Sequence, residues 1–161
     1  MGWTAPRTWL VGEVVTAGVM NTHIRDNLID LNSRATMVSN TLVTAQTRSV
    51  TTFGDLATVG PSVTLVTHTL VEVMLSVAVE QNTDSSGGLM SFAVSGASTI
   101  AADNVRAVGT TFQRAADKAR WSDSFILTVT PGSNTFTGKY RTQNSGTASF
   151  DNRTIKVRRL N

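Results

Sequence analysis

The chain has 161 residues and a mass of 17.2 kDa, and its 14 Lys and Arg residues slightly outnumber its 11 Asp and Glu residues. This length predicts one domain with an appended arm, because folding at this size removes roughly two-thirds of the unfolded surface from water. The sequence contains no Cys, which excludes disulfides, thiolate metal sites and cysteine nucleophiles.

The abundance of uncharged polar residues indicates a mainly β protein. The chain contains 25 Thr and 15 Ser but only 3 Lys. Thr is β-branched and Ser competes for backbone hydrogen bonds, so this composition favours strands and turns over long helices.

The charge distribution does not predict nucleic-acid binding. A formal charge of +3 is small for this length, and dedicated DNA-binding proteins concentrate their basic residues on one face. The basic excess lies towards the C-terminus, in Lys139, Arg141, Arg153, Lys156, Arg158 and Arg159. We interpret it as a solvated strand face or a subunit contact. The apolar stretches are shorter than the roughly 18 residues that span a bilayer, and the N-terminus lacks a signal-peptide layout, so we expect a soluble protein with no membrane partner.

The first predicted element is an amphipathic helix over about residues 17–34, with Thr16 as a suitable N-cap. Four apolar residues spaced four, four and three apart share one helix face, namely Met20, Ile24, Leu28 and Leu31. The stripe continues as a heptad-like pattern into a Thr-rich segment, where helix formation is disfavoured. Such a helix packs either on its own domain or against partner helices, and the sequence leaves both alternatives open.

Two tryptophans, Trp3 and Trp9, precede the helix. Aromatic side chains in a short terminal segment leave a large apolar area in water unless they pack on something. We therefore interpret them as anchors, which either fold back on the domain or insert into a neighbouring subunit or particle surface.

From Val63 onwards the apolar pattern has a period of two. The clearest strand covers residues 71–80, where every odd position is Val or Leu. The next predicted strand has its inward-facing apolar side chains at alternate positions, namely Met90, Phe92 and Val94. Further strands are predicted at residues 105–112, 124–130, 134–142, 147–150 and 153–160.

Turn signals over residues 81–88, 130–134 and 143–146 separate these strands. The segment 113–121 predicts either a helical turn or a loop anchored by Trp121. Short strands without intervening helices favour an antiparallel β-sandwich or jelly roll. The expected organisation is an extended N-terminal arm over residues 1–54, containing the helix and a Thr-rich linker, followed by a β-sandwich domain over residues 55–161.

The sequence does not assemble a catalytic site. His23 lies beside the helix stripe and His68 near a strand start, and both are interpreted as surface or hydrogen-bonding side chains. His68 and Glu72 would lie about 13 Å apart along a strand, too far for a dyad or a metal site. Neither a nucleophile elbow nor a phosphate-binding glycine loop is present. We expect no enzymatic activity, no cofactor and no metal.

The N-terminal sequence resembles a segment of many tailed-phage virion proteins. In those proteins the phrase G-x-x-(V/L)-T-A-x-x-(M/L)-N leads into a helix. This chain has Gly12, Thr16-Ala17 and Met20-Asn21 at the matching positions, followed by Arg25-Asp26-Asn27-Leu28. Residues 131–141 and 146–157 are similar to the closing strands of small β domains in the same proteins.

The resemblance implies a phage structural protein with a homotrimeric β domain whose arm attaches to the virion. The chain has no shaft repeats and no separate tip, which favours a capsid decoration or minor capsid protein on the capsid surface over a minor tail or fibre-associated protein. The implied partners are other copies of this chain and the major capsid protein or another virion protein, and synthesis is expected in the host cytoplasm. The residues expected at the virion or subunit interface are Trp3, Trp9, Leu10, Val11, Met20, Ile24, Leu28 and Leu31.

A second hypothesis, from another class, is a recognition module that binds cell-wall carbohydrate or a host receptor. Sugar binding requires an exposed aromatic platform, and the candidate residues for this contact are Trp121 and Tyr140. Removal of residues 1–34 separates the two hypotheses, because only attachment through the arm depends on this segment.

Overall fold

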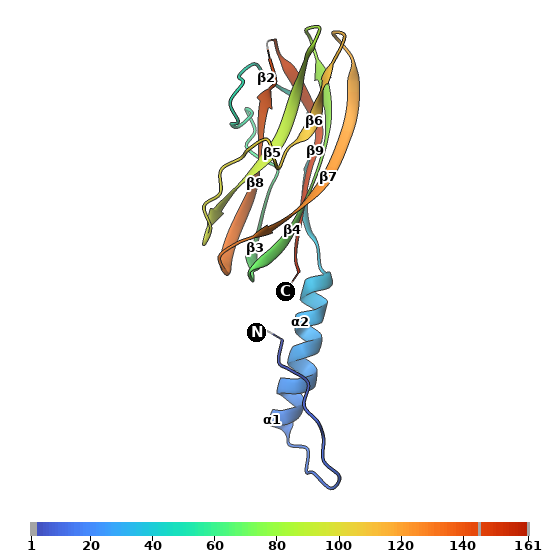
Figure 1. The fold of residues 1–161 in the computed structure, drawn as a ribbon, viewed down its shortest axis with the longest axis vertical. Coiled ribbons are helices and arrows are strands. Elements are labelled where there is room, and N and C mark those ends of the chain that lie inside the picture. The colour runs from blue at the N-terminus through green and yellow to red at the C-terminus, as the bar shows by residue number, and fades with distance from the viewer. Residues whose placement is uncertain (1–2, 145, 161) are drawn as a thin grey trace. The chain divides into compact units, whose positions relative to one another are not determined.

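The computed structural model describes residues 3–144 and 146–160 of the chain. The chain forms two compact units, Met1–Met37 and Val38–Asn161. The first contains the helix and the second contains the strands (Figure 1).

The N-terminal unit consists of an extended segment followed by a helix. The helix comprises α1 (Ala17–Met20), a π-helical turn η1 (Asn21–Arg25) and α2 (Asp26–Ala35). It confirms the helix predicted over residues 17–34. Thr16 is the N-cap, since its hydroxyl accepts a hydrogen bond from the amide of Val19 at 3.3 Å.

The second unit is a sandwich of antiparallel sheets. Its strands are β1 (Val38–Leu42), β2 (Gln46–Arg48), β3 (Ser62–Thr67), β4 (Leu70–Gln81), β5 (Ser86–Gly96), β6 (Val108–Phe112), β7 (Lys118–Thr128), β8 (Gly132–Thr142) and β9 (Ala148–Arg159). One sheet has the order β1-β9-β4-β7, with β2 also paired to β9, and the other has the order β3-β8-β5-β6. The predicted antiparallel β-sandwich of the jelly-roll type is confirmed.

The core lies between the sheets and follows the period-two pattern of the sequence. The odd-numbered residues of β4 from Val71 to Val79 are fully buried. They pack with inward residues of the other sheet, which include Met90, Phe92 and Phe136. Burial of these apolar side chains, at about 25 cal/mol per Å², is the main stabilising contribution to this unit.

The Thr-rich segment expected to act as a linker instead contributes strands. β1 pairs with residues Arg153 to Val157 of β9, and β2 pairs with residues Ala148 to Phe150 of the same strand. The β unit therefore begins at residue 38, whereas the sequence placed its start at residue 55. Thr and Val suit a strand at the side of a sheet once a neighbouring strand supplies the backbone hydrogen bonds.

The segment predicted as a helical turn or loop over residues 113–121 runs into β7. This strand begins at Lys118 and pairs with β4 along its length, with Trp121 opposite Val77. β7 is an edge strand of its sheet, and most of its side chains are exposed. Its polar residues therefore obscure the alternation that would otherwise identify a strand.

The two strands predicted at residues 147–150 and 153–160 form one strand with a bulge. Thr154 pairs with Ser76 and Asp151 pairs with Ala78. Two residues of β9, Asn152 and Arg153, therefore lie opposite the single residue Val77 of β4, which is a β-bulge. Asn152 accommodates the bulge with a φ of 48°. The bulge turns Arg153 inward, and its side chain is only 1% exposed.

Tyr140 is the only tyrosine of the chain, and it is fully buried in the core. Its hydroxyl donates a hydrogen bond to the carbonyl oxygen of Gly60 at 2.9 Å. Burial raises the pKa of this hydroxyl strongly, and the nearby Arg153 guanidinium offsets only part of that effect.

The raised pKa predicts a loss of stability in alkali. The unfolded chain ionises its tyrosine near pH 10 while the folded chain retains the proton, so above pH 10 the unfolded state binds fewer protons. Above pH 10 the free energy of unfolding should then fall by up to about 1.4 kcal/mol per pH unit. Below pH 10 both states keep the proton, so this group makes the free energy of unfolding neither rise nor fall with pH. Tyrosinate absorbance should appear only together with unfolding measured by circular dichroism, and Tyr140→Phe should lose this part of the pH dependence. Tyrosinate absorbance near pH 10 in a fully folded protein would contradict the prediction.

Candidate functional site

The residues predicted for the interface all lie in the N-terminal unit, and all of them are exposed. Their side chains range from 41% exposure at Trp9 and Ile24 to full exposure at Val11. Ile24, Leu28 and Leu31 lie on one surface of the helix, as the sequence predicted. Met20 precedes the π-helical turn η1, which changes the helical period, and it is not part of that surface. Solvent exposure along such a stripe is unfavourable for an isolated chain.

The extended segment is held against the helix by a reciprocal pair of hydrogen bonds. The amide nitrogen of Thr4 donates to Oδ1 of Asn27, and Nδ2 of Asn27 donates to the carbonyl oxygen of Thr4, both at 2.9 Å. Further along α2, Arg34 forms an ion pair with the buried Asp30 at 2.6 Å. Asn27 was not among the predicted site residues, although an Asn in the middle of a predicted helix is a signal for such a contact.

A shallow apolar groove of about 210 Å³ lies between the extended segment and the helix. It is lined by Trp3, Pro6, His23, Ile24, Asn27, Leu28 and Leu31. One predicted tryptophan and most of the helix stripe are thus brought together in one surface, which we call the arm groove.

The other predicted tryptophan lies near a turn at the end of the extended segment. Arg7 forms an ion pair with Glu13, and its guanidinium lies 5.0 Å from the centre of the Trp9 ring. Gly12 has a φ of 81°, a conformation that favours glycine. Leu10 and Val11 at this turn are largely exposed, so it presents a separate apolar tip.

The N-terminal unit has no apolar core within its described residues. Its buried side chains are the polar Asn27 and Asp30, and every buried hydrophobic residue of the described chain belongs to the β unit. More than half of the exposed large hydrophobic side chains nevertheless lie in this short unit. A unit of this kind gains little stability from its own packing, because an isolated helix of this length is marginal in water.

The two aromatic residues proposed for sugar contact have different surroundings. Trp121 is 40% exposed at the side of the sandwich, whereas Tyr140 is completely buried. The assignment of Tyr140 as a ligand contact was therefore wrong. Tyr140 and Phe136 are both even-numbered residues of β8, and the even-numbered side chains of this strand from Asn134 onwards are buried. Both rings therefore lie in the core.

The histidines do not come together with acidic residues. Nε2 of His68 lies 3.2 Å from Nη1 of Arg159, and Glu72 contacts Arg158 instead. Within the ranges that the structure describes, no group of three or more His, Asp or Glu side chains could hold a metal ion. None of the helices described here is long and apolar enough to cross a membrane.

No protein-family model matches the sequence, and no curated protein matches it. Solved structures do share its fold. Eiger TNF from S. frugiperda matches with a TM-score of 0.50 and 10% identity over 78% of this chain and 93% of that chain. The structure of infectious bursal disease virus, Gt strain, matches with a TM-score of 0.51 and 10% identity over 75% of this chain. The VP2 subviral particle of infectious bursal disease virus matches with a TM-score of 0.50 and 6% identity over 76% of this chain. The matched region spans 32% of each viral chain. The β unit thus has a jelly-roll fold that also occurs in a viral capsid protein.

Proposed function

We propose that this protein is a non-enzymatic structural protein of a tailed-phage virion, a homotrimeric capsid decoration or minor capsid protein attached through its N-terminal unit. The observation that carries the proposal is the absence of an apolar core in the described part of that unit, combined with its exposed stripe and tryptophans. The β unit supports it by sharing a fold with VP2 of a subviral particle.

The physical argument concerns what covers the apolar side chains of the arm groove. Burying an Ile or Leu side chain stabilises an assembly by about 2 kcal/mol relative to leaving it in water. Helix stripes with a spacing near 3.5 residues are covered by equivalent stripes of partner helices. Three copies of the helix would cover one another, and the apolar tip at Leu10 and Val11 would remain for the particle surface.

The trimer is tested with a double variant of the stripe, Ile24→Asp with Leu28→Asp. Each charge would have to be buried in the helix contact, so the association constant should drop by at least about a thousandfold. Sedimentation equilibrium should give a trimer for the unmodified protein and a monomer for the variant. Ile29→Asp is the matched control, because Ile29 is exposed on a different side of the same helix and its variant should remain trimeric. A monomeric unmodified protein, or a trimeric double variant, would contradict the proposed contact.

Attachment is tested on purified particles by quantitative mass spectrometry against the major capsid protein. A copy number comparable to that of the capsid protein is expected for a lattice decoration. Deletion of residues 1–34 should remove the protein from the particle, since the apolar anchors are lost. A handful of copies in multiples of three or six would move the protein to the tail, and its absence from particles would overturn the virion proposal.

A further inference from the structure

The outer face of the β1-β9-β4-β7 sheet carries a polar groove that the proposed function does not use. The groove has a volume of about 240 Å³ and is lined by Met74, Ser76, Arg120, Ser122, Thr154 and Lys156. The register places Ser76 between Thr154 on β9 and Ser122 on β7. The floor of this sheet groove is therefore a row of hydroxyls on adjacent strands about 4.8 Å apart.

The hydroxyl row retains hydrogen-bonding capacity. Ser122 donates to the carbonyl oxygen of Leu75 at 2.9 Å, and the Thr154 hydroxyl lies 2.9 Å from that of Thr41. Each of these oxygens can still accept a bond, and the hydroxyl of Ser76 makes none with the described part of the chain. The bulge of β9 follows directly after the Thr154–Ser76 pair, and bulges are frequent beside binding sites because they re-aim side chains.

Two cations flank the hydroxyl row on opposite sides, Lys156 next to Thr154 along β9 and Arg120 next to Ser122 along β7. Lys156 is paired with Met74 and Arg120 with Ala78. Met74 and Ala78 are four residues apart on β4, so the two cations are separated by about 13 Å in the direction of the strands. Neither cation makes an ion pair or a hydrogen bond within residues 3–144 and 146–160. Arg114 is the only other Lys or Arg without such a contact in these ranges, and it lies outside the groove.

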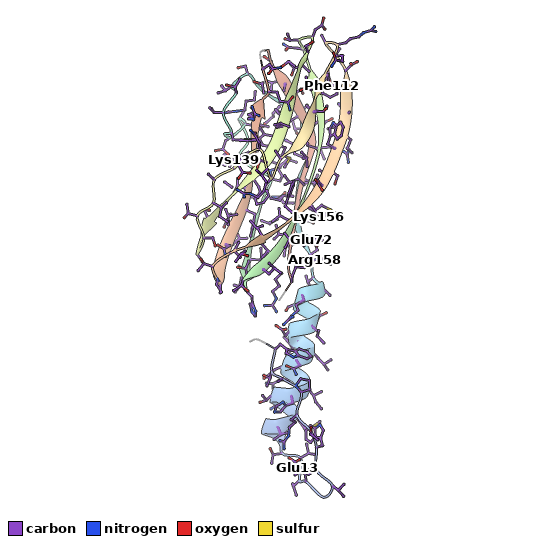
Figure 2. The ribbon with its side chains drawn as sticks, viewed as in Figure 1. Glu13, Glu72, Phe112, Lys139, Lys156 and Arg158 are labelled. Atoms are coloured by element: carbon purple, nitrogen blue, oxygen red, sulfur yellow. The ribbon has the colours of Figure 1, made fainter. Side chains whose placement is uncertain are left out.

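The acidic residues of this face are Glu72, Glu80 and Asp151, and none of them forms an ion pair with Lys156 or Arg120 in the described ranges. Glu72 contacts Nε of Arg158 at 2.5 Å, and Asp151 contacts Nζ of Lys118 at 3.2 Å. Figure 2 labels Glu72 and Arg158 beside Lys156 near one end of the β unit. No carboxylate lines the groove, so its two positive charges are available to an anionic ligand.

We infer that the sheet groove binds an acidic oligosaccharide, a chain of sugars that carries carboxylates. The cations would pair with sugar carboxylates, the hydroxyl row would exchange hydrogen bonds with sugar hydroxyls, and Met74 would contact a C–H face. The separation of the cations suits a chain of several sugars better than a single small anion. This inference concerns the β unit alone and does not depend on the attachment of the N-terminal unit.

The test is calorimetric titration of the full chain with a hyaluronan hexasaccharide, in which a carboxylate occurs on every second sugar. Lys156→Gln and Arg120→Gln should each weaken binding by at least about fivefold, because each removes one charge-assisted contact. Arg114→Gln is the matched control, since it removes an equally unpaired charge outside the groove and should bind like the unmodified protein. Circular dichroism checks that every variant is folded.

A neutral chitin hexasaccharide and inorganic phosphate complete the experiment. The chitin oligomer should bind at least about tenfold more weakly than hyaluronan, since it cannot pair with the cations. The inference is overturned if hyaluronan does not bind at about 10 mM, or if the groove variants bind like the control. Phosphate binding as strong as hyaluronan binding would overturn it too, because the groove would then recognise charge alone.

Discussion

Gly87→Ala should separate β5 from β6 and reduce the free energy of unfolding of the β unit by about 4 kcal/mol. A methyl carbon added at Gly87 would lie 1.8 Å from the carbonyl oxygen of Thr110 and 2.7 Å from its carbonyl carbon. Both are backbone atoms, so no change of side-chain rotamer relieves the clash. β6 is at the side of its sheet, and its displacement would expose the buried Val108 and Phe112.

Urea denaturation followed by tryptophan fluorescence and circular dichroism measures this effect. Gly18→Ala provides the control, because the added carbon would meet only the hydroxyl of Thr16, at 3.9 Å. Alanine is also the better helix former, so this control should not lower stability. An unchanged denaturation midpoint for Gly87→Ala would mean that β5 and β6 are not in contact as described.

Arg153→Ala should reduce the free energy of unfolding by about 3 kcal/mol. The buried guanidinium donates from Nη2 to the carbonyl oxygen of Thr44 at 3.0 Å and from Nη1 to Oε1 of Gln46 at 3.3 Å. It also lies 5.6 Å from the centre of the Tyr140 ring. Its removal leaves a cavity beside Tyr140 and takes the charged donor away from the connection between β1 and β2.

The matched control for this variant is Arg158→Ala on the same strand. Arg158 faces outward and is partly exposed in its ion pair with Glu72, and exposed pairs of this kind contribute about 0–1 kcal/mol. Hydrogen exchange of the amides in β1 and β2 gives a second measurement, since these strands should lose protection first in Arg153→Ala. Equal stability of the two variants would show that Arg153 does not hold this connection.

The sequence predicted the strands whose two sides differ in polarity. Alternation over residues 71–80 identified β4, because one side of that strand is wholly apolar. For β7 it identified only residues 124–128 and missed the part around Trp121, because an exposed edge position leaves that residue among polar neighbours. β1 and β2 were missed for another reason. Their hydrogen-bond partner is β9, at least 100 residues away for every pair of the register, and local patterns do not report long-range pairing.

The candidate sites were predictable to different degrees. Helical spacing alone grouped Ile24, Leu28 and Leu31, and the structure places them in one groove with Trp3. The sheet groove could not be predicted from the sequence, because Lys156 on β9 and Arg120 on β7 come together only through the pairing of these two strands with β4. The burial of Tyr140 was within reach, since the period-two row of β8 contains it together with Asn134 and Phe136.

The position of β9 has a consequence for how the chain folds during synthesis. β9 lies between β1 and β4 and also pairs with β2, yet it follows all of them in the chain. Until residues 148–159 have left the ribosome, β4 presents an unpaired edge of backbone amides and carbonyls to other nascent chains. The sheet can therefore close only late, and pairing between such distant segments is slow. Folding of this protein should accordingly depend on a chaperone that shields strand edges, and a chain truncated before β9 should aggregate.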